Sequence, residues 1–550
     1  MIAKTAITRR LKATQRFLNI PARKAFPGDA LKIAVGGKVV EERCMALASK
    51  EEAEFWQYVD LSLWRGKEVE IRFAGYTNLE DPLAEVFLSD SIKGLEAAYA
   101  ERYRPQFHYT PRQGWNNDVN GAVYYDGEYH LFYQYDPSQS GRIGRNMHWG
   151  HAVSKDLFHW EELPIALGTD PVRGQVYSGS AIVDEDNVAG LQKGKEKTMI
   201  AFYSRRYPYT TLMHDFDVGG TSQCMAYSTD RGRTWTHVKE PVVPMLTTKN
   251  RDPKVFWHEE TRQWIMVFFK VHGFVFYGST DLFHWQEVGK IDGYHECPDI
   301  FQLAIDGDPG NTKWVLVNGS GDYSLGYFDG KSFAVEYRGR SEFGPISATQ
   351  TFGQAPGGIA YRTQLSWLHV SPPDMPFKQM ISLPMDLTLR STEDGPRIFS
   401  NPSALIGKLH GRTITLSTGQ IAGQQVRKEL VPWELVDGNF SIDLNGATEV
   451  AFEIRGILVS YDMKSGLLAI GPKGEKGGKP AATVKPVAGK LKIRAILDRC
   501  TLDLIVNGGQ AHLVGAAYPD ETKPFLRLTQ GNDRVRIGNA AFTEMKSTWE

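Results

Sequence analysis

Ser154-Lys-Asp-Leu-Phe-His-Trp160 recurs almost unchanged as Ser279-Thr-Asp-Leu-Phe-His-Trp285, and a looser copy, Ser228-Thr-Asp-Arg-Gly-Arg-Thr-Trp235, lies between them. Tyr327-Phe-Asp-Gly-Lys-Ser-Phe333 is a weaker fourth copy. Each copy stands between strand-like runs, so each is predicted to be a hairpin turn whose Asp bonds its own backbone. A turn and an aromatic residue that repeat in this way are typical of β-propeller blades. We therefore expect the repeated Trp residues to pack blades rather than to bind a ligand.

The rest of the chain is also predicted to be β-structure. Long apolar patterns with the period of a helix are almost absent, whereas short alternating runs bounded by Gly, Asn and Asp are frequent. We expect an all-β fold with a small N-terminal β domain at 1–102, a propeller at 103–395 and a C-terminal β-sandwich at 396–550. In the first part, Phe55–Trp64 and Val69–Phe73 alternate like strands. This domain either binds carbohydrate or only braces the propeller.

Composition excludes several kinds of partner. The 550 residues carry a formal net charge of −1 and are 41% hydrophobic. This balance gives no attraction to nucleic-acid phosphates or anionic lipid, so neither nucleic acid nor a membrane is expected as a partner. No run approaches the ~18 apolar residues of a membrane span. A neutral substrate such as a sugar fits this charge.

Cysteine usage and the first residues bear on redox chemistry and location. Cys44, Cys224, Cys297 and Cys500 lie far apart, without the paired spacing of a zinc site or a redox dithiol, so we expect free thiols and no metal. The first ten residues contain charges but no apolar run of signal-peptide length. The sequence as it stands therefore predicts a cytoplasmic location, or a secreted or periplasmic one if a leader has been removed.

Three acidic motifs carry the chemistry. They are Gly114-Trp-Asn-Asn-Asp-Val-Asn-Gly121, Arg251-Asp-Pro-Lys254 and Glu296-Cys-Pro-Asp299. Cleaving a glycosidic acetal requires one ionised carboxylate beside the anomeric carbon and one protonated carboxylic acid at the leaving oxygen. Asp118 and Glu296 are the candidates for these two roles. Together the motifs indicate a glycoside hydrolase.

The first motif and three further segments resemble glycoside hydrolase family 32, the invertases, inulinases, levanases and related fructosyltransferases. The family motif Trp-Met-Asn-Asp-Pro-Asn-Gly is similar to residues 115–121. Other family segments are similar to Phe132-Tyr-Gln-Tyr-Asp-Pro137, His148-Trp-Gly-His-Ala-Val-Ser154 and Tyr177-Ser-Gly-Ser180, in the same order. Each motif alone is weak, but their shared order makes the resemblance specific.

The resemblance implies a five-bladed β-propeller catalytic domain followed by a β-sandwich, with no cofactor. It implies Asp118 as nucleophile, Glu296 as general acid and then base, and Asp252 as the carboxylate that holds sugar hydroxyls and stabilises the transition state. Asp252 should stay ionised, because the neighbouring Arg251 guanidinium favours a charged carboxylate. The mainly apolar sequence neighbours of Glu296 should favour its protonated form.

Substrate contacts are expected from the same segments and from one further Trp. An aromatic face can pack against a sugar ring, while amide, hydroxyl and guanidinium groups bind its hydroxyls. The residues expected to contact substrate are Trp115, Asn117, Gln134, Trp149, Tyr177, Ser178, Arg251 and Trp367.

Three departures from the family pattern bear on substrate preference. Asn116 and Val119 stand where the family has Met and Pro, and Ile143-Gly144 stands where it often has Trp-Gly. Side chains beside a reacting group mainly adjust how the sugar and the leaving group are seated. We therefore expect these positions to alter substrate preference more than the bond-breaking step.

The expected activity is hydrolysis of β-fructofuranosidic bonds in fructans of levan or inulin type, or in short fructosides such as sucrose, by double displacement. A fructosyltransferase would use the same intermediate with a sugar acceptor. An inverting arabinofuranosidase-like propeller would also use three carboxylates, but with its carboxyl groups ~6.5–9.5 Å apart instead of ~5–5.5 Å. A fructan-binding protein without turnover is the nonenzymatic alternative, and the intact Asp118 and Glu296 argue against it. The sequence gives no sign of linkage preference or oligomeric state.

Overall fold

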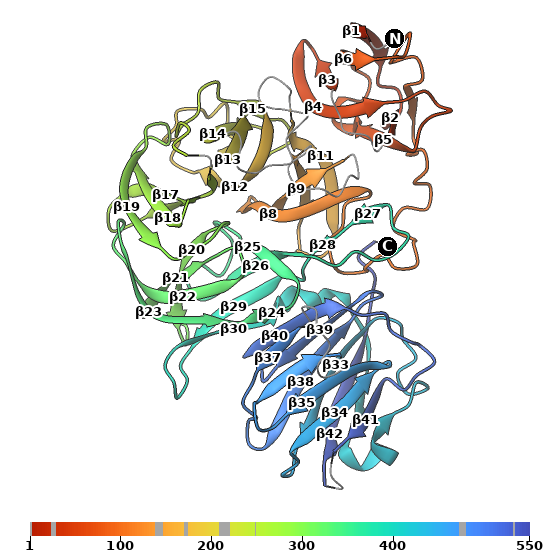
Figure 1. The fold of residues 1–550 in the computed structure, drawn as a ribbon, viewed down its shortest axis with the longest axis vertical. Helices are drawn as coiled ribbons and strands as arrows, with labels where there is room; N and C mark the ends of the chain where they lie inside the picture. Colours follow the sequence, from red (N-terminus) through yellow and green to blue (C-terminus); the bar gives the residue numbers. More distant parts are fainter. Residues whose placement is uncertain are drawn as a thin grey trace.

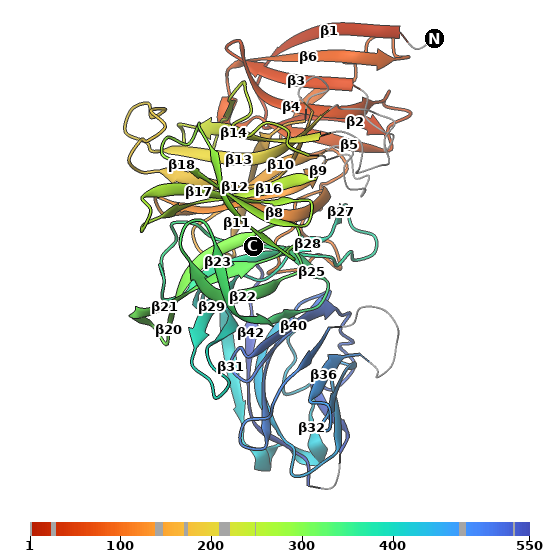
Figure 2. The same cartoon turned by 60° about the vertical axis from the view of Figure 1, so that its left-hand side comes forward.

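Nearly every regular element of the computed structural model is a β-strand, as the alternating sequence pattern predicts. Figure 1 shows an N-terminal sheet domain in red, a ring of blades running from orange to teal, and a two-sheet domain in blue. The turned view in Figure 2 keeps the ring of blades between the other two parts. The structure describes residues 3–23, 29–137, 147–169, 174–207, 220–247, 249–471, 480–531 and 534–549.

The N-terminal domain is a small β domain around one apolar core. Its elements are β1 (Ala3–Lys12), β2 (Phe17–Arg23), β3 (Asp29–Val35), β4 (Lys38–Leu47), β5 (Phe55–Asp60), η1 (Ser62–Trp64), β6 (Glu68–Thr77) and β7 (Phe87–Ser89). Alternation along β5 and β6 turns Val59, Ile71 and Phe73 into the core. The strand predicted over 55–64 ends early, because Asp60 accepts the backbone N–H of Ser62 at 2.9 Å and turns the chain into η1.

The middle region is a five-bladed propeller. Its first three blades are β8 (Gly114–Tyr125), β9 (Glu128–Asp136), β10 (His148–Ser154) and β11 (Trp160–Leu167); β12 (Gln175–Asp184), β13 (Thr198–Tyr207), β14 (Gly220–Ser228) and β15 (Thr236–His237); and β16 (Asn250–His258), β17 (Gln263–Lys270), β18 (Gly273–Ser279) and β19 (Gln286–Asp292). Strands within each blade pair antiparallel in chain order. The short strand β27 (Phe377–Lys378) adds to the first blade beside β8, and so returns the chain to the start of the ring.

The last two blades share one sheet. The fourth is β20 (Asp299–Ile305), β21 (Asp308–Val317), β22 (Asp322–Phe328) and β23 (Phe333–Arg340), and the fifth is β25 (Ile346–Thr351), β26 (Arg362–Leu368), β28 (Met380–Ile381), β29 (Met385–Arg390) and β30 (Arg397–Pro402). The first strands of the blades face the centre, since β12 contacts β8 and β16 while β25 contacts β8 and β20. The domain boundary predicted at residue 395 falls between β29 and β30, which pair as neighbours, so the fifth blade extends to Pro402.

The repeated turns have the predicted construction. Asp156 and Asp281 each accept hydrogen bonds through Oδ1 from two backbone N–H groups of their own turn, at 2.8–3.1 Å. Trp235 packs edge-on against Phe132 of the preceding blade, with ring centroids 5.5 Å apart, and Trp285 packs in the same way on the blade before it. These repeats therefore hold neighbouring blades together, as expected.

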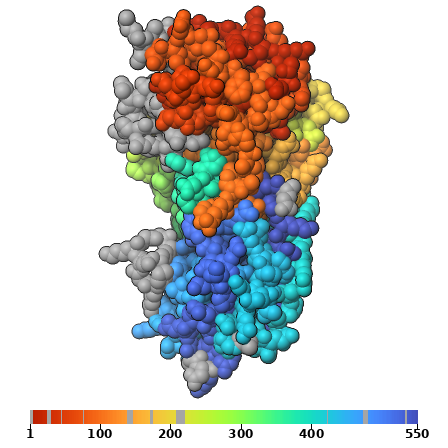
Figure 3. Space-filling model, turned by 90° about the vertical axis from the view of Figure 1, so that its right-hand side faces the viewer, coloured from red at the N-terminus to blue at the C-terminus, as the bar shows by residue number. Residues whose placement is uncertain are grey.

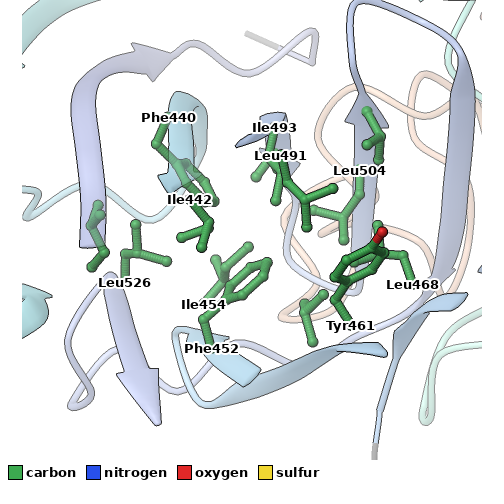
Figure 4. Packing of buried hydrophobic residues seen from close by; sticks show 14 of the residues in the cluster. Phe440, Ile442, Phe452, Ile454, Tyr461, Leu468, Leu491, Ile493, Leu504 and Leu526 are labelled. Atoms are coloured by element: carbon green, nitrogen blue, oxygen red, sulfur yellow. The ribbon is translucent and has the colours of Figure 1, made fainter. Parts of the chain in front are cut away.

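The C-terminal part is a β-sandwich whose two sheets enclose a large apolar core. Figure 4 shows side chains from both sheets interdigitating, among them Phe440, Phe452 and Leu504. A short strand from the propeller, β24 (Glu342–Phe343), joins the edge of one sheet beside β40. The other elements are η2 (Ala404–Leu409), β31 (His410–Leu416), η3 (Thr418–Gln420), η4 (Ala422–Gln424), β32 (Gln425–Val426), β33 (Val436–Asp443), β34 (Glu449–Ile454), β35 (Ile457–Asp462), β36 (Leu467–Ile470), β37 (Ala481–Thr483), β38 (Lys490–Leu497), β39 (Thr501–Val506), β40 (Ala511–Ala516), β41 (Leu526–Gln530) and β42 (Arg536–Met545).

The segment between the N-terminal domain and the first blade binds the three parts together. Figure 3 shows this orange segment running down to the blue sandwich. Tyr99 stacks on Trp549 with ring centroids 4.2 Å apart, and Tyr103 packs edge-on against Tyr518 at 5.3 Å. The contacts join residues more than 400 positions apart in sequence, so this segment fixes the sandwich to the propeller.

A buried chain of charged groups crosses the same interface. His108 lies 3.0 Å from Asp498 and 3.3 Å from Asp503, and His512 lies 2.8 Å from Asp503 and 3.3 Å from Glu342. Burial alone would lower the pKa of both histidines, but the adjacent carboxylates outweigh it and raise the pKa of each to about 9. At neutral pH the interface therefore holds two positively charged imidazoles among carboxylates.

Candidate active site

Two of the three acidic motifs lie where the register of an innermost strand shifts. The register of β8 on β9 shifts within 116–119, that of β12 on β13 within 176–179, and that of β16 on β17 within 251–254. Such bulges leave residues unpaired and re-aim their side chains, and they are frequent beside active sites. The residues inside these three bulges include Asp118, Ser178 and Asp252.

The backbone around the site is held in an uncommon conformation. Asp252, Glu296, Cys297 and Ala348 have φ values of 64°, 40°, 39° and 49°. A positive φ is unfavourable for residues with a side chain and persists only where the surrounding structure fixes it, often at functional sites. Two of these four residues are predicted catalytic carboxylates.

A cavity of about 420 Å³ opens among these residues. Its size is within the range of small-molecule sites. It is lined by Asn117, Asp118, Gln134, Met147, Tyr177, Ser178, Arg206, Thr221, Lys249, Arg251, Asp252, Phe269, Val271, His295, Glu296 and Trp367. The structure therefore brings the three predicted carboxylates into one pocket.

Asp118 is half-buried and held by short hydrogen bonds. Its Oδ2 accepts the Ser178 hydroxyl at 2.6 Å, and its backbone N–H donates to the Asn117 side chain at 2.7 Å. Burial raises the pKa of Asp118 to about 6, an effect that the Ser178 hydrogen bond opposes and the nearby Glu296 charge reinforces. Asp118 is therefore fixed in orientation and ionised above about pH 6.

Asp252 departs from the expectation that Arg251 keeps it ionised. The carboxylate is buried, although Arg251 Nε lies only 3.6 Å from its Oδ2. Burial raises the pKa of Asp252 to about 7, because desolvation outweighs the guanidinium and the charges of Glu296 and Asp118 act in the same direction as burial. The charged neighbour of Asp252 can be read from the sequence, but the depth to which its carboxylate is buried cannot.

Glu296 does not have the apolar surroundings predicted for it. Its side chain is 37% exposed, and its Oε1 accepts a hydrogen bond from the Arg251 guanidinium. The imidazole Nε2 of His295 lies 3.7 Å from the same oxygen. Glu296 is therefore on the open side of the pocket, whereas Asp252 is at its buried side.

Comparison with known proteins identifies the family. The family model for the glycosyl hydrolases family 32 N-terminal domain matches residues 108–402, which is more than half of the chain. A levanase from Bacillus subtilis (strain 168) is 34% identical over 503 residues, covering 82% of this chain and 72% of the levanase. This chain belongs to glycoside hydrolase family 32.

Other family 32 proteins agree in sequence and fold. An extracellular exo-inulinase from Aspergillus niger is 33% identical over 526 residues, covering 82% of this chain and 96% of that protein. The crystal structure of exo-inulinase from Aspergillus awamori superposes with a TM-score of 0.69 at 26% identity, covering 82% of this chain and all of that one. The family match begins at residue 108, so the N-terminal domain lies outside it.

Most of the predicted substrate contacts of this family 32 member line the pocket. They are Asn117, Gln134, Tyr177, Ser178, Arg251 and Trp367. The Gln134 amide donates to the Val176 carbonyl at 3.1 Å, and the Tyr177 hydroxyl accepts from Arg206 at 3.1 Å. These bonds hold the side chains in place within the pocket wall.

Trp115 and Trp149 do not line the pocket. Trp149 is fully buried, and its indole N–H donates to the Tyr177 carbonyl at 3.0 Å. Trp115 is also buried and shares the side-chain oxygen of Gln379 with Trp367, at 2.6 and 2.8 Å. Both residues therefore support lining residues instead of forming the pocket surface themselves.

The departures from the family motif also lie away from the pocket. Asn116 is fully buried, and Val119 packs in the apolar core between blades. Neither lines the cavity, so the expectation that they seat the sugar directly finds no support in their positions. Ile143-Gly144 falls outside the described residues.

Several lining residues were not predicted from the sequence. Arg206, Lys249 and His295 add positive or titratable groups, and Phe269 contributes an aromatic face beneath the Arg251 guanidinium at 5.0 Å. Phe269 is the register partner of Arg251 across β16 and β17. Pairing that strand with its hairpin neighbour would have been the available sequence signal.

The final residues of two acidic motifs, Lys254 and Asp299, form a buried ion pair. Lys254 Nζ lies 3.0 Å from Asp299 Oδ1 and donates to the Thr351 carbonyl at 3.2 Å, and both charged side chains are buried. Asp299 also accepts the backbone N–H groups of Ile300 and Thr351 at 2.9 and 2.6 Å. This ion pair joins β16, β20 and β25 close in sequence to two predicted catalytic carboxylates, since Lys254 follows Asp252 by two residues and Asp299 follows Glu296 by three.

The thiols in the described part of the chain form no disulfide bonds. Cys224, Cys297 and Cys500 are free there, and Cys297 Sγ lies 3.6 Å from a carboxylate oxygen of both Asp118 and Asp252. The described residues contain no cluster of three or more His, Cys, Asp or Glu suited to a metal ion. No helix in this part of the chain has the length and apolarity to cross a membrane.

Proposed function

We propose that this family 32 hydrolase is a retaining β-fructofuranosidase that cleaves fructans of levan or inulin type, or short fructosides such as sucrose. The observation that carries the proposal is the meeting of Asp118, Asp252 and Glu296 in one pocket. The levanase and exo-inulinase names of its relatives support the choice of fructans as substrates.

In the proposed first step, Asp118 attacks the anomeric carbon while Glu296 gives its proton to the leaving oxygen, which departs with its sugar. This forms a fructosyl ester on Asp118. In the second step Glu296 takes a proton from water, whose oxygen displaces Asp118 and releases fructose with retained configuration. The exposure of Glu296 supports this role, because both the leaving group and water must reach it.

Asp252 is proposed to bind sugar hydroxyls as positive charge develops on the ring. A buried carboxylate interacts strongly with a developing cation, because little water screens it. Hydroxyl donors from the substrate would also favour the ionised form of Asp252, offsetting the burial that raises its pKa in the free protein. Arg251 contacts both Asp252 and Glu296 and so holds the two carboxylates in a fixed position relative to each other.

The test is product chromatography after incubation with levan, inulin and sucrose, with Asp118→Ala as the control protein. The proposal predicts fructose from at least one substrate and none from the variant. NMR of the first-formed anomer should show retention, whereas inversion would indicate a single-displacement mechanism with a bridging water. Oligomeric fructosides at high substrate would indicate transfer to sugar, and binding without any product would indicate a nonenzymatic fructan-binding protein.

A further inference from the structure

The backbone that carries Glu296 depends on its neighbours for its conformation. Glu296 and Cys297 lie in the segment between β19 and β20, with successive φ values of 40° and 39°. The Cys297 backbone N–H donates to Asp252 Oδ2 at 3.2 Å, and the Arg251 guanidinium donates to Glu296 Oε1. Residues with a side chain keep a positive φ only where surrounding contacts fix it. The direction in which Glu296 points is therefore set by what packs against this segment.

Gly319, in the turn between β21 and β22, is buried against the same segment. Its backbone N–H donates to the His295 carbonyl at 3.0 Å, and its own carbonyl accepts the Ala348 N–H of β25 at 2.8 Å. The turn is itself fixed, because the Asn318 side-chain oxygen accepts two of its backbone N–H groups at 3.1 and 3.2 Å. Gly319 thus connects the fourth and fifth blades to the residue that precedes Glu296.

Position 319 has no room for a side chain unless a neighbour moves. A Cβ atom on Gly319 would lie 3.2 Å from the Glu296 Cβ and 3.3 Å from the Glu296 carbonyl oxygen. Ordinary van der Waals contact begins at 3.4 Å, so Glu296 would have to shift by a few tenths of an ångström. Gly319 does not have a positive φ. The close approach to Glu296, and not the backbone conformation, is therefore what requires glycine here.

We propose that Gly319 is a positioning residue for Glu296. Its bare backbone lets the fourth blade pack against the Glu296 Cβ, and this contact fixes where the carboxyl group meets the leaving oxygen. Gly319 does not line the catalytic pocket, so it acts through Glu296 and not on the substrate. This role rests on the proposed function, since it presupposes Glu296 as the acid and base.

The position of a general acid matters most when the leaving group is poor. An alkoxide that leaves a natural fructoside needs the proton of Glu296, whereas p-nitrophenolate can leave without it. A misplaced acid should therefore lower kcat/KM for the natural fructoside and leave kcat/KM for p-nitrophenyl β-D-fructofuranoside nearly unchanged. A loss of folded protein lowers both values by the same factor, so it does not change their ratio.

The experiment measures the ratio of these two kcat/KM values, natural over activated, with whichever of sucrose, inulin and levan the parent cleaves fastest. We expect Gly319→Ala to lower the ratio about tenfold or more, since misplacing a catalytic group by about 1 Å can cost about 10²-fold. Glu296→Gln has no proton to give and should lower the ratio further.

Gly353→Ala is the matched control. Gly353 also donates and accepts one backbone hydrogen bond, to Ala122 and from Tyr124, at 2.9 Å each. A Cβ atom there would meet nothing nearer than the Ala122 carbonyl oxygen at 3.8 Å, and Gly353 does not have a positive φ. The ratio for this variant should equal that of the parent.

The outcomes separate the role of Gly319 from the proposed function. If Glu296→Gln lowers the ratio and Gly319→Ala does not, the role of Gly319 is overturned and the proposed function stands. The same conclusion follows if Gly353→Ala lowers the ratio as much as Gly319→Ala. If Glu296→Gln leaves the ratio unchanged, or the parent cleaves none of the fructosides, the proposed function fails and the role of Gly319 fails with it.

Discussion

Replacing Asp252 by Asn should make the folded protein more stable at pH 8 while it removes most of the catalytic efficiency. Asp252 is buried, and burial raises its pKa to about 7 from an ordinary value of 3.8. The asparagine amide has nearly the same shape but carries no charge. It therefore removes both the cost of burying the carboxylate and the charge that the proposed transition state requires.

The size and sign of the stability change follow from the two pKa values. Below pH 3.8 both the folded and the unfolded state hold the proton, so the carboxyl costs nothing. Between 3.8 and about 7 the unfolded state loses the proton first, and stability falls as the pH rises. Above about 7 the cost is complete, at about 4 kcal/mol for a change of about 3 pKa units. The advantage of Asp252→Asn should therefore be near zero at pH 4 and largest at pH 8.

Thermal unfolding of both proteins at pH 4, 6 and 8 is the assay. A gain of about 4 kcal/mol corresponds to a rise of roughly 5–10 °C for a propeller of this size. Asp299→Asn is the matched control, since Asp299 is equally buried but paired with Lys254, and breaking that pair should lower stability by about 3–5 kcal/mol. A stability difference between Asp252→Asn and the parent that does not change with pH would refute the reasoning. Catalytic efficiency should fall on the order of 10²-fold or more.

Further outcomes are expected at four positions. Asp118→Ala should abolish turnover without unfolding the protein, and Glu296→Gln should remove the alkaline limb of the kcat/KM profile on any activated substrate still cleaved. Ser178→Ala removes a hydrogen bond that lowers the pKa of Asp118, so the Asp118 ionisation that contributes to the acid limb of the kcat/KM profile should move to higher pH. An unmoved limb would assign it to Asp252, whose pKa is about 7. His512→Gln should lower the melting temperature by several degrees at pH 6 and progressively less as the pH rises through about 9, because the stabilising charge of His512 is complete below 6.5 and lost through about 9; the exposed pair variant His284→Gln should change little at either pH.

The sequence predicted the fold well because local repeats encode it. The Asp and Trp of each repeated turn bond and pack within a few residues or with the adjacent blade, so their roles can be inferred from spacing. The three acidic motifs were also identifiable, since each is short and contiguous. Their meeting in one pocket required only that each lies near the start of an inner blade strand, or just before it.

How deeply a residue is buried, and which way its side chain faces, could not be predicted in the same way. Trp149 and Asn116 sit inside or beside recognised motifs, yet both are fully buried. Whether a residue in a strand faces the pocket depends on where the bulges shift the two-residue alternation, and the bulges are set by pairing with the next strand. The same limitation explains Asp252, whose burial outweighs the adjacent Arg251 although the sequence shows only the guanidinium.

The bulges also explain how one short motif can supply both a reactive group and its support. Asp252 and Lys254 are two residues apart, yet the first lines the pocket and the second pairs with Asp299 outside it. Asp299 in turn lies three residues after Glu296. A carboxylate that the fold disfavours in its charged form tends to move toward water, so rigid neighbouring contacts such as the Lys254–Asp299 pair are needed to keep it in place. Damage to the Lys254–Asp299 pair should therefore reduce activity through displaced carboxylates, even though neither residue lines the catalytic pocket.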